Sequence, residues 1–180
     1  EAGEYQPASA ENRESRSKGE QSIENDHGWL RIRGGRYGKC YDSRSGCLAE
    51  GDYATYFDNG KIEYKVTFVG GLANGRETLW WPDGSLRSDG VLKDGLGEGL
   101  GQSWHFNGQL ARRRFMKAGD FDGLYEMWSP TGQKTWETSY QDGNYHGYEK
   151  GFDEDGKLSW CVYYRHGIKL ADFYGYELLE

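Results

Sequence analysis

Residues 75–98 read GRETLWWPDGSLRSDGVLKDGLGE, and residues 99–122 read GLGQSWHFNGQLARRRFMKAGDFD. The two stretches align without a gap: glycine opens each, tryptophan is sixth, and further glycines are tenth and twenty-first. The same spacing runs through residues 51–170, which therefore contain five units of 24 residues. A fixed period of this length is typical of stacked supersecondary units.

Each unit predicts a β-hairpin. A short first strand is followed by a turn such as Asp58-Asn59-Gly60, and then by a second strand in which apolar and polar residues alternate. Glycine at the tenth position supplies the positive φ that tight hairpin turns require. These turn glycines are Gly60, Gly84, Gly108, Gly132 and Gly156. The sequence therefore predicts an all-β fold, an elongated antiparallel meander of tandem 24-residue hairpins.

The composition agrees with this fold class. The 180 residues include 28 Gly, 7 Trp, 14 Tyr and 7 Phe, a mixture that disfavours helices and favours pleated surfaces. No run approaches the ~18 apolar residues of a membrane helix. The net charge of -7 argues against nucleic acid as a partner, because phosphate binding needs a basic face.

The two ends depart from the repeat. Residues 1–27 hold seven acidic and three basic residues with few apolar ones, so we expect a disordered acidic tether. Residues 28–50 are interpreted as a degenerate N-terminal capping repeat, and residues 171–180 as a partial C-terminal repeat or cap. Edge strands at both ends can pair with a second copy, so a homodimer stays open.

A polar tether before a β domain is typical of an exported bacterial protein, held in some cases by an N-terminal lipid anchor. We therefore expect a periplasmic or membrane-anchored location, with a cytoplasmic one as the alternative. Cys40 and Cys47 flank a turn, so a disulfide between them is feasible in an oxidising compartment. Otherwise they are two ordinary thiols.

Little in the sequence points to catalysis. The four histidines have no Ser, Cys or Asp partner at a recognisable spacing, and no Cys/His cluster suits zinc. Asp153-Glu154-Asp155-Gly156 resembles the start of a calcium loop, but the downstream ligands are missing and the segment falls on a hairpin turn. We therefore predict no catalytic residue, no cofactor and no metal.

Arg112, Arg113 and Arg114 form the one basic cluster. Arg112 and Arg114 take positions that are apolar in most other repeats, so they break the pattern. Either their stems pack while their heads reach water, or they bind an anion on an aromatic face, a partner's carboxylate or a lipid phosphate. The aromatic stripe of that expected binding face is Trp80, Trp104 and Trp128.

Tyr56-x-x-Asn59-Gly60-Lys61-Ile62, with its later copies and the following Gly-x-x-x-Gly, resembles the MORN repeat variant over residues 51–170. The resemblance implies a binding protein without catalytic residues. Bacterial tandem copies resemble antitoxins, among them immunity lipoproteins that neutralise effectors such as type VI secretion phospholipases. We therefore predict a non-enzymatic module that binds and neutralises an effector toxin. The alternative is a membrane-surface scaffold that binds anionic lipid or organises a protein complex.

Overall fold

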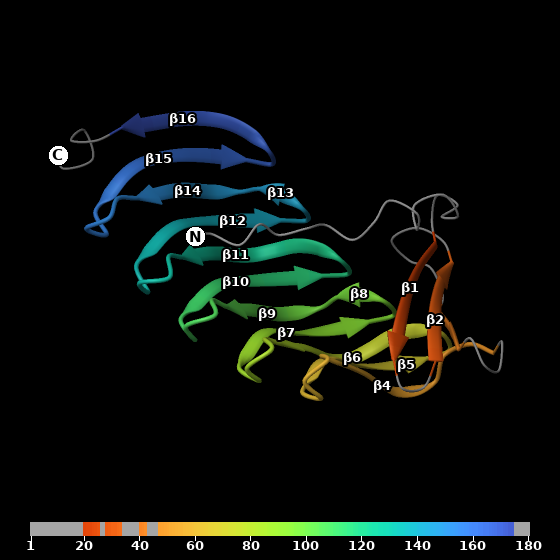
Figure 1. The fold of residues 1–180 in the computed structure, drawn as a ribbon. Coiled ribbons are helices and arrows are strands. Elements are labelled where there is room, and N and C mark those ends of the chain that lie inside the picture. Colours follow the sequence, from red (N-terminus) through yellow and green to blue (C-terminus); the bar gives the residue numbers. More distant parts are fainter. Residues whose placement is uncertain (1–19, 26–27, 34–39, 43–46, 175–180) are drawn as a thin grey trace, which may run out of the picture.

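The computed structural model describes residues 20–25, 28–33, 40–42 and 47–174. In these residues all regular secondary structure is β-strand (Figure 1). Thirteen of these strands form one large sheet, and three form a smaller one. The large sheet is a single open layer whose strands follow one another in chain order and pair antiparallel. The predicted all-β meander is confirmed.

The strands of the large sheet reproduce the 24-residue period. The second strand of each repeat spans eight residues: β5 (Ile62–Val69), β7 (Leu86–Lys93), β10 (Leu110–Lys117), β12 (Lys134–Gln141) and β15 (Leu158–Arg165). The continuous first strands are β4 (Gly51–Tyr56), β6 (Leu72–Trp80), β11 (Asp120–Trp128) and β16 (Ile168–Tyr174). Two others are interrupted, β8 (Leu96–Gly97) with β9 (Gly99–Trp104), and β13 (Asn144–Tyr145) with β14 (Gly147–Phe152).

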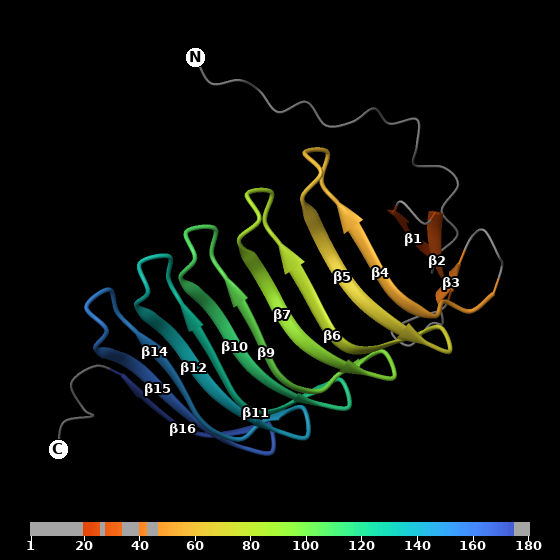
Figure 2. The same ribbon diagram turned by 90° about the horizontal axis from the view of Figure 1, so that it is seen from below.

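Hairpin tips line one edge of the large sheet (Figure 2). In the first tip, the Gly60 N–H donates to the Phe57 carbonyl at 2.8 Å, and the Phe57 N–H donates to the Lys61 carbonyl at 2.8 Å. The tip glycines of all five repeats have φ between 77° and 89°, as this turn requires. Neighbouring tips are also joined, because Asn59 Nδ2 donates to the Pro82 carbonyl at 2.8 Å.

Two-residue turns line the opposite edge (Figure 2). Asp94 and Gly95 have φ of 52° and 80°, the signs of a type I′ turn. The Gly95 N–H then donates to the Ala73 carbonyl of the preceding repeat at 2.8 Å, and the equivalent bond recurs from Gly143 to Phe121 at 2.9 Å. The Gly-x-x-x-Gly segments therefore close each repeat and also attach it to the one before.

The N-terminal end differs from the prediction. Strand β1 (Glu20–Asn25) lies within the segment that we expected to be disordered, and it pairs with β2 (Gly28–Arg33) so that Ile23 is opposite Leu30. Strand β3 (Cys40–Asp42) completes a three-stranded sheet that is separate from the large one. A backbone partner in β2 is enough to give a polar segment a strand conformation. Residues 1–19 and 175–180 lie outside the described residues.

Buried side chains gather at this same end of the large sheet. Val66 and Phe68 of β5 pack with Tyr53 of β4, and Cys40 and Ala49 complete the cluster. Farther along the array, Glu126, Thr138, Cys161 and Val162 are also buried. Because successive side chains of a strand point to opposite faces, β10 defines an Arg112 face, which also carries Arg114, and an Arg113 face.

Candidate functional site

The three consecutive arginines do not form one site. Arg113 projects from the opposite face to Arg112 and Arg114, and it makes an ion pair with Glu126 of the neighbouring strand β11. Its Nε and one terminal nitrogen each lie 2.6 Å from Glu126 Oε2. Glu126 is 2% exposed, so its carboxylate depends on partners within the protein. The structure therefore assigns Arg113 a structural contact.

Glu126 belongs to a network that crosses four strands of the Arg113 face. Lys134 Nζ lies 2.6 Å from Glu126 and 2.9 Å from Glu137, and Lys150 Nζ lies 2.8 Å from Glu137. Burial alone would lower the pKa of Lys134, but its hydrogen bonds to the two carboxylates leave that pKa raised. Burial likewise opposes the charge of Glu137, and the two lysines still hold the pKa of Glu137 below its usual range.

Trp128 lies on this same Arg113 face. The Arg113 guanidinium carbon and Lys134 Nζ each lie 5.6 Å from the centre of its ring. Trp80 and Trp104 occupy the equivalent place in their repeats, opposite Leu86 and Leu110, as Trp128 is opposite Lys134. We expected these tryptophans to share a face with Arg112 and Arg114. The structure places them on the other side of the sheet.

Arg112 and Arg114 have different surroundings. Across the neighbouring strands, Arg112 is opposite Ser103 and Met127, and Arg114 is opposite Gly101 and Tyr125. Among the described residues neither guanidinium makes an ion pair, and the buried Nε of Arg114 has no hydrogen-bond acceptor. Two uncompensated cations two residues apart on one strand form a candidate site for an anion.

Small residues keep one side of this pair open. Ser88 and Gly90 of β7 lie beyond Ser103 and Gly101 of β9 on the same face. A side chain at Gly90 would approach only the Gly101 backbone, at 3.8 Å, whereas one at Gly101 would meet Arg114 Nε at 3.4 Å. On this side the arginine pair is therefore bordered by four small residues, Ser88, Gly90, Gly101 and Ser103.

An aromatic ladder borders the other side of the pair. Tyr125 lies 5.3 Å from Trp136 and 5.2 Å from Phe121 between ring centres, and Phe121 lies 5.0 Å from Tyr140. The ladder continues through Tyr140, Tyr145 and Tyr164 in stacked steps of 4.8 and 5.0 Å. Sequence reasoning missed Phe121, Tyr125 and Tyr145 as members of this face. Strand alternation extended across the two-residue turns would have found them.

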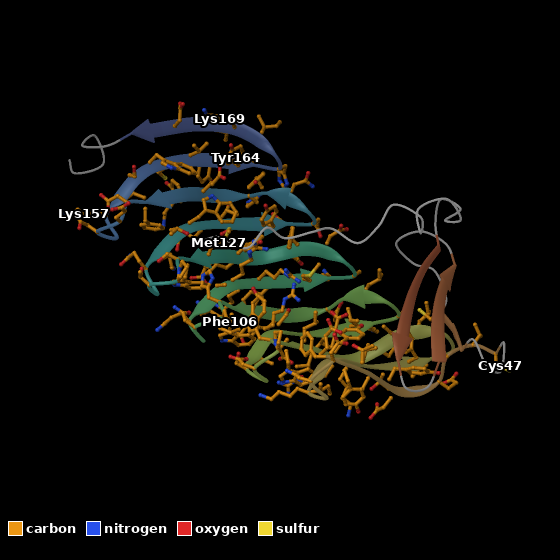
Figure 3. All side chains as sticks on the ribbon, viewed as in Figure 1. Cys47, Phe106, Met127, Lys157, Tyr164 and Lys169 are labelled. Atoms are coloured by element: carbon orange, nitrogen blue, oxygen red, sulfur yellow. The ribbon has the colours of Figure 1, made fainter. Side chains whose placement is uncertain are left out.

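Of the two alternatives for Cys40 and Cys47, a disulfide or two ordinary thiols, the structure shows no disulfide. Cys40 is buried in the N-terminal cluster, where burial raises the pKa of its thiol, whereas Cys47 lies at an exposed position. Figure 3 shows Cys47 away from the large sheet, in the segment that leads into it. Cys40 packs with Ala49 and Val66 in that cluster.

Residues 49–69 match the protein family described as MORN repeat variant. No curated protein matches the sequence. The matched segment contains β4, the first hairpin tip and β5, so it corresponds to one hairpin of the array. MORN repeats are in general modules that bind proteins or membranes. Within the described residues no helix is long and apolar enough to cross a membrane, and no cluster of metal-ligating side chains occurs.

Proposed function

We propose that the chain is a non-enzymatic binding module whose Arg112 face holds a protein partner. The observation that carries this proposal is the contrast in pairing along β10. Arg113 is neutralised by Glu126, whereas Arg112 and Arg114 have no anionic partner among the described residues. A pair of carboxylates on a bound protein would supply these missing anions, and arginine is well suited to bidentate recognition of carboxylates. The aromatic ladder beside them adds the residue types that dominate binding energy at interfaces.

Our finer proposal is that the partner is a secreted effector toxin, such as a type VI secretion phospholipase, and that the bound array blocks its active site. It is supported by the likeness of the repeats to bacterial antitoxin and immunity proteins and by the acidic N-terminal stretch, which suits a tether to the membrane. The protein would then act in the periplasm, either freely or through an N-terminal lipid anchor.

The test uses the full tagged chain as bait in a native lysate of the producing bacterium, followed by reconstitution with the retained protein. We expect one stoichiometric partner whose toxicity in co-expression is suppressed by the chain. Arg112→Ala with Arg114→Ala should weaken the measured affinity at least about tenfold, because each charge-assisted hydrogen bond contributes about 1.5–3 kcal/mol. Lys93→Ala, an exposed cation at the turn edge, is the matched control.

A lipid-binding scaffold is the alternative, since a lipid phosphate would also suit two guanidiniums. The net charge of -7 disfavours it, because anionic membranes attract clusters of several lysines and arginines. Co-sedimentation with phosphatidylglycerol vesicles, abolished by the Arg112 and Arg114 substitutions, would favour the scaffold. A partner that the chain binds without reducing its toxicity would overturn the neutralising role.

A further inference from the structure

A cluster of two aromatic groups and one cation lies at the hairpin tips of the second and third repeats. The rings of Trp81 and Phe106 meet edge to face, with their centres 5.8 Å apart. The Arg87 guanidinium lies over Trp81, 4.8 Å from its ring centre. Figure 3 places Phe106 at the tip edge of the sheet, the same edge that carries Lys157 in the fifth repeat. We call these three residues the tip cluster.

Phe106 is not required to be aromatic by the turn in which it lies. It occupies the second turn residue, where the other four tips have Asp58, Pro82, Pro130 and Glu154. Polar residues and proline suit that position, and proline also fixes the φ that the turn needs. Phe106 is nevertheless 61% exposed, one of the most exposed large apolar side chains among the described residues. A local departure from good turn chemistry of this kind often marks a binding residue.

Two further groups in the tip cluster lack partners. The indole N–H of Trp81 is buried without a hydrogen-bond acceptor among the described residues. A buried donor left in this state costs free energy that an incoming acceptor would recover. Arg87 is exposed, makes no ion pair with the described residues, and is oriented by its contact with the Trp81 ring. The cluster thus combines two donors for an anion with one exposed apolar ring.

We propose that the tip cluster is a recognition site for a protein loop that carries an aspartate or glutamate beside an apolar side chain. The carboxylate pairs with the Arg87 guanidinium and accepts a hydrogen bond from the indole N–H of Trp81. The exposed Arg87 and Phe106 side chains shift to let the carboxylate reach this N–H. The apolar neighbour packs on Phe106. Charge complementarity and the residue types favour this occupant, since Trp and Arg are enriched where interfaces are strongest. The site lies at the edge of the sheet and does not depend on the Arg112 face.

The experiment is a display selection of random 12-residue peptides on the full chain, followed by affinity measurements with the enriched peptides. We expect the enriched peptides to share an acidic residue next to Leu, Ile, Val or Phe. Binding should shift the resonance of the Trp81 indole N–H in nuclear magnetic resonance spectra, because this buried donor gains an acceptor. Replacing the acidic residue by its amide should weaken binding at least about tenfold, as expected for a charged hydrogen bond.

Residues from other repeats supply matched variants that keep the turn intact. Phe106→Pro introduces the residue found at two other tips, and Arg87→Ala introduces the residue of the third repeat. Each should reduce the affinity of the peptides at least about tenfold. Glu154→Pro makes the same backbone change at the fifth tip and should leave the affinity unchanged. Circular dichroism should show that all three variants fold.

The proposal is overturned if the selection yields no peptide, or yields peptides without an acidic residue. It is also overturned if Phe106→Pro and Arg87→Ala bind the peptides as well as the unchanged chain does. The Arg112→Ala and Arg114→Ala variant keeps the two proposals apart: it should leave peptide binding at the tip cluster unaffected while weakening the partner of the Arg112 face.

Discussion

Arginine has different surroundings on the two faces of the sheet. On the Arg113 face, Arg113 is fixed by the buried Glu126, whose other partner, Lys134, is shared with Glu137. On the Arg112 face, two arginines of the same strand border small residues and an aromatic ladder, and no carboxylate in the described part of the chain pairs with them. Whether an arginine has a structural role or is available for binding therefore depends on the residues opposite it on the neighbouring strands. Stability and affinity should accordingly respond to different arginines.

The largest effect on stability should come from Glu126→Ala. The change leaves the Arg113 and Lys134 cations without their shared buried acceptor, and breaking a buried charge network is strongly destabilising. We expect the free energy of unfolding to fall by about 3 kcal/mol. Urea denaturation followed by tryptophan fluorescence measures it. Glu154→Ala at an exposed hairpin tip is the control, and equal effects of the two substitutions would contradict the buried role of Glu126.

Arg113→Ala should have the next largest effect. Glu126 then keeps Lys134 but loses the hydrogen bond from Arg113 Nε and the ion pair with the guanidinium, and the Trp128 ring loses a cation above it. Because the Arg113 side chain is partly exposed, we expect a loss of about 1.5–2 kcal/mol in the same urea measurement, less than for Glu126. Arg112→Ala on the opposite face should change stability by less than about 0.5 kcal/mol. A similar loss of stability for Arg113→Ala and Arg112→Ala would contradict the different roles proposed for the arginines on the two faces.

Acid should remove the contribution that Glu137 of the Arg113 face makes to the free energy of unfolding. The folded-state pKa of Glu137 lies below its ordinary value of 4.5, so its stabilising contribution is present above about pH 4.5 and is lost as the pH falls through the folded-state pKa. Glu137→Gln should therefore be less stable than the unchanged chain at pH 7, by less than Arg113→Ala. The difference should shrink as the pH falls below about 4.5 and through the folded-state pKa of Glu137. A difference that persists in acid would assign the role of Glu137 to packing.

The sequence periodicity was sufficient to predict the array of hairpins, but it did not predict which face of the sheet each side chain occupies. The 24-residue spacing of glycines predicted each hairpin, because turn geometry depends on local residues such as Gly60 and Gly95. The assignment of side chains to faces failed where a β-bulge interrupts alternation. Between Met127 and Trp128 the pairing with β12 shifts by one residue, so Lys134 reaches Glu126 on the Arg113 face. Such a shift reverses which face a side chain occupies.

The charge network had no local signal in the sequence. Arg113 and Glu126 are 13 residues apart, and their pairing depends on the register of β10 against β11. The adjacent letters Arg112-Arg113-Arg114 gave no indication that only the middle residue faces a buried carboxylate. The strand β1 was missed for a related reason, since its pairing with β2 is made through the backbone and leaves little trace in composition.

The smallest effect should come from Arg114→Met, which tests the Arg112 face directly. Methionine keeps an apolar stem over Gly101 and beside Tyr125, and it removes a buried Nε that has no acceptor. Since an unsatisfied buried donor costs free energy, its removal offsets the lost packing, and we expect a change of no more than about 0.5 kcal/mol, including a small gain. Arg113→Met, the matched change on the other face, should remain destabilising in the same urea titration. A loss of more than about 1 kcal/mol for Arg114→Met would mean that Arg114 supports the sheet as Arg113 does, and it would withdraw Arg114 from the proposed binding site.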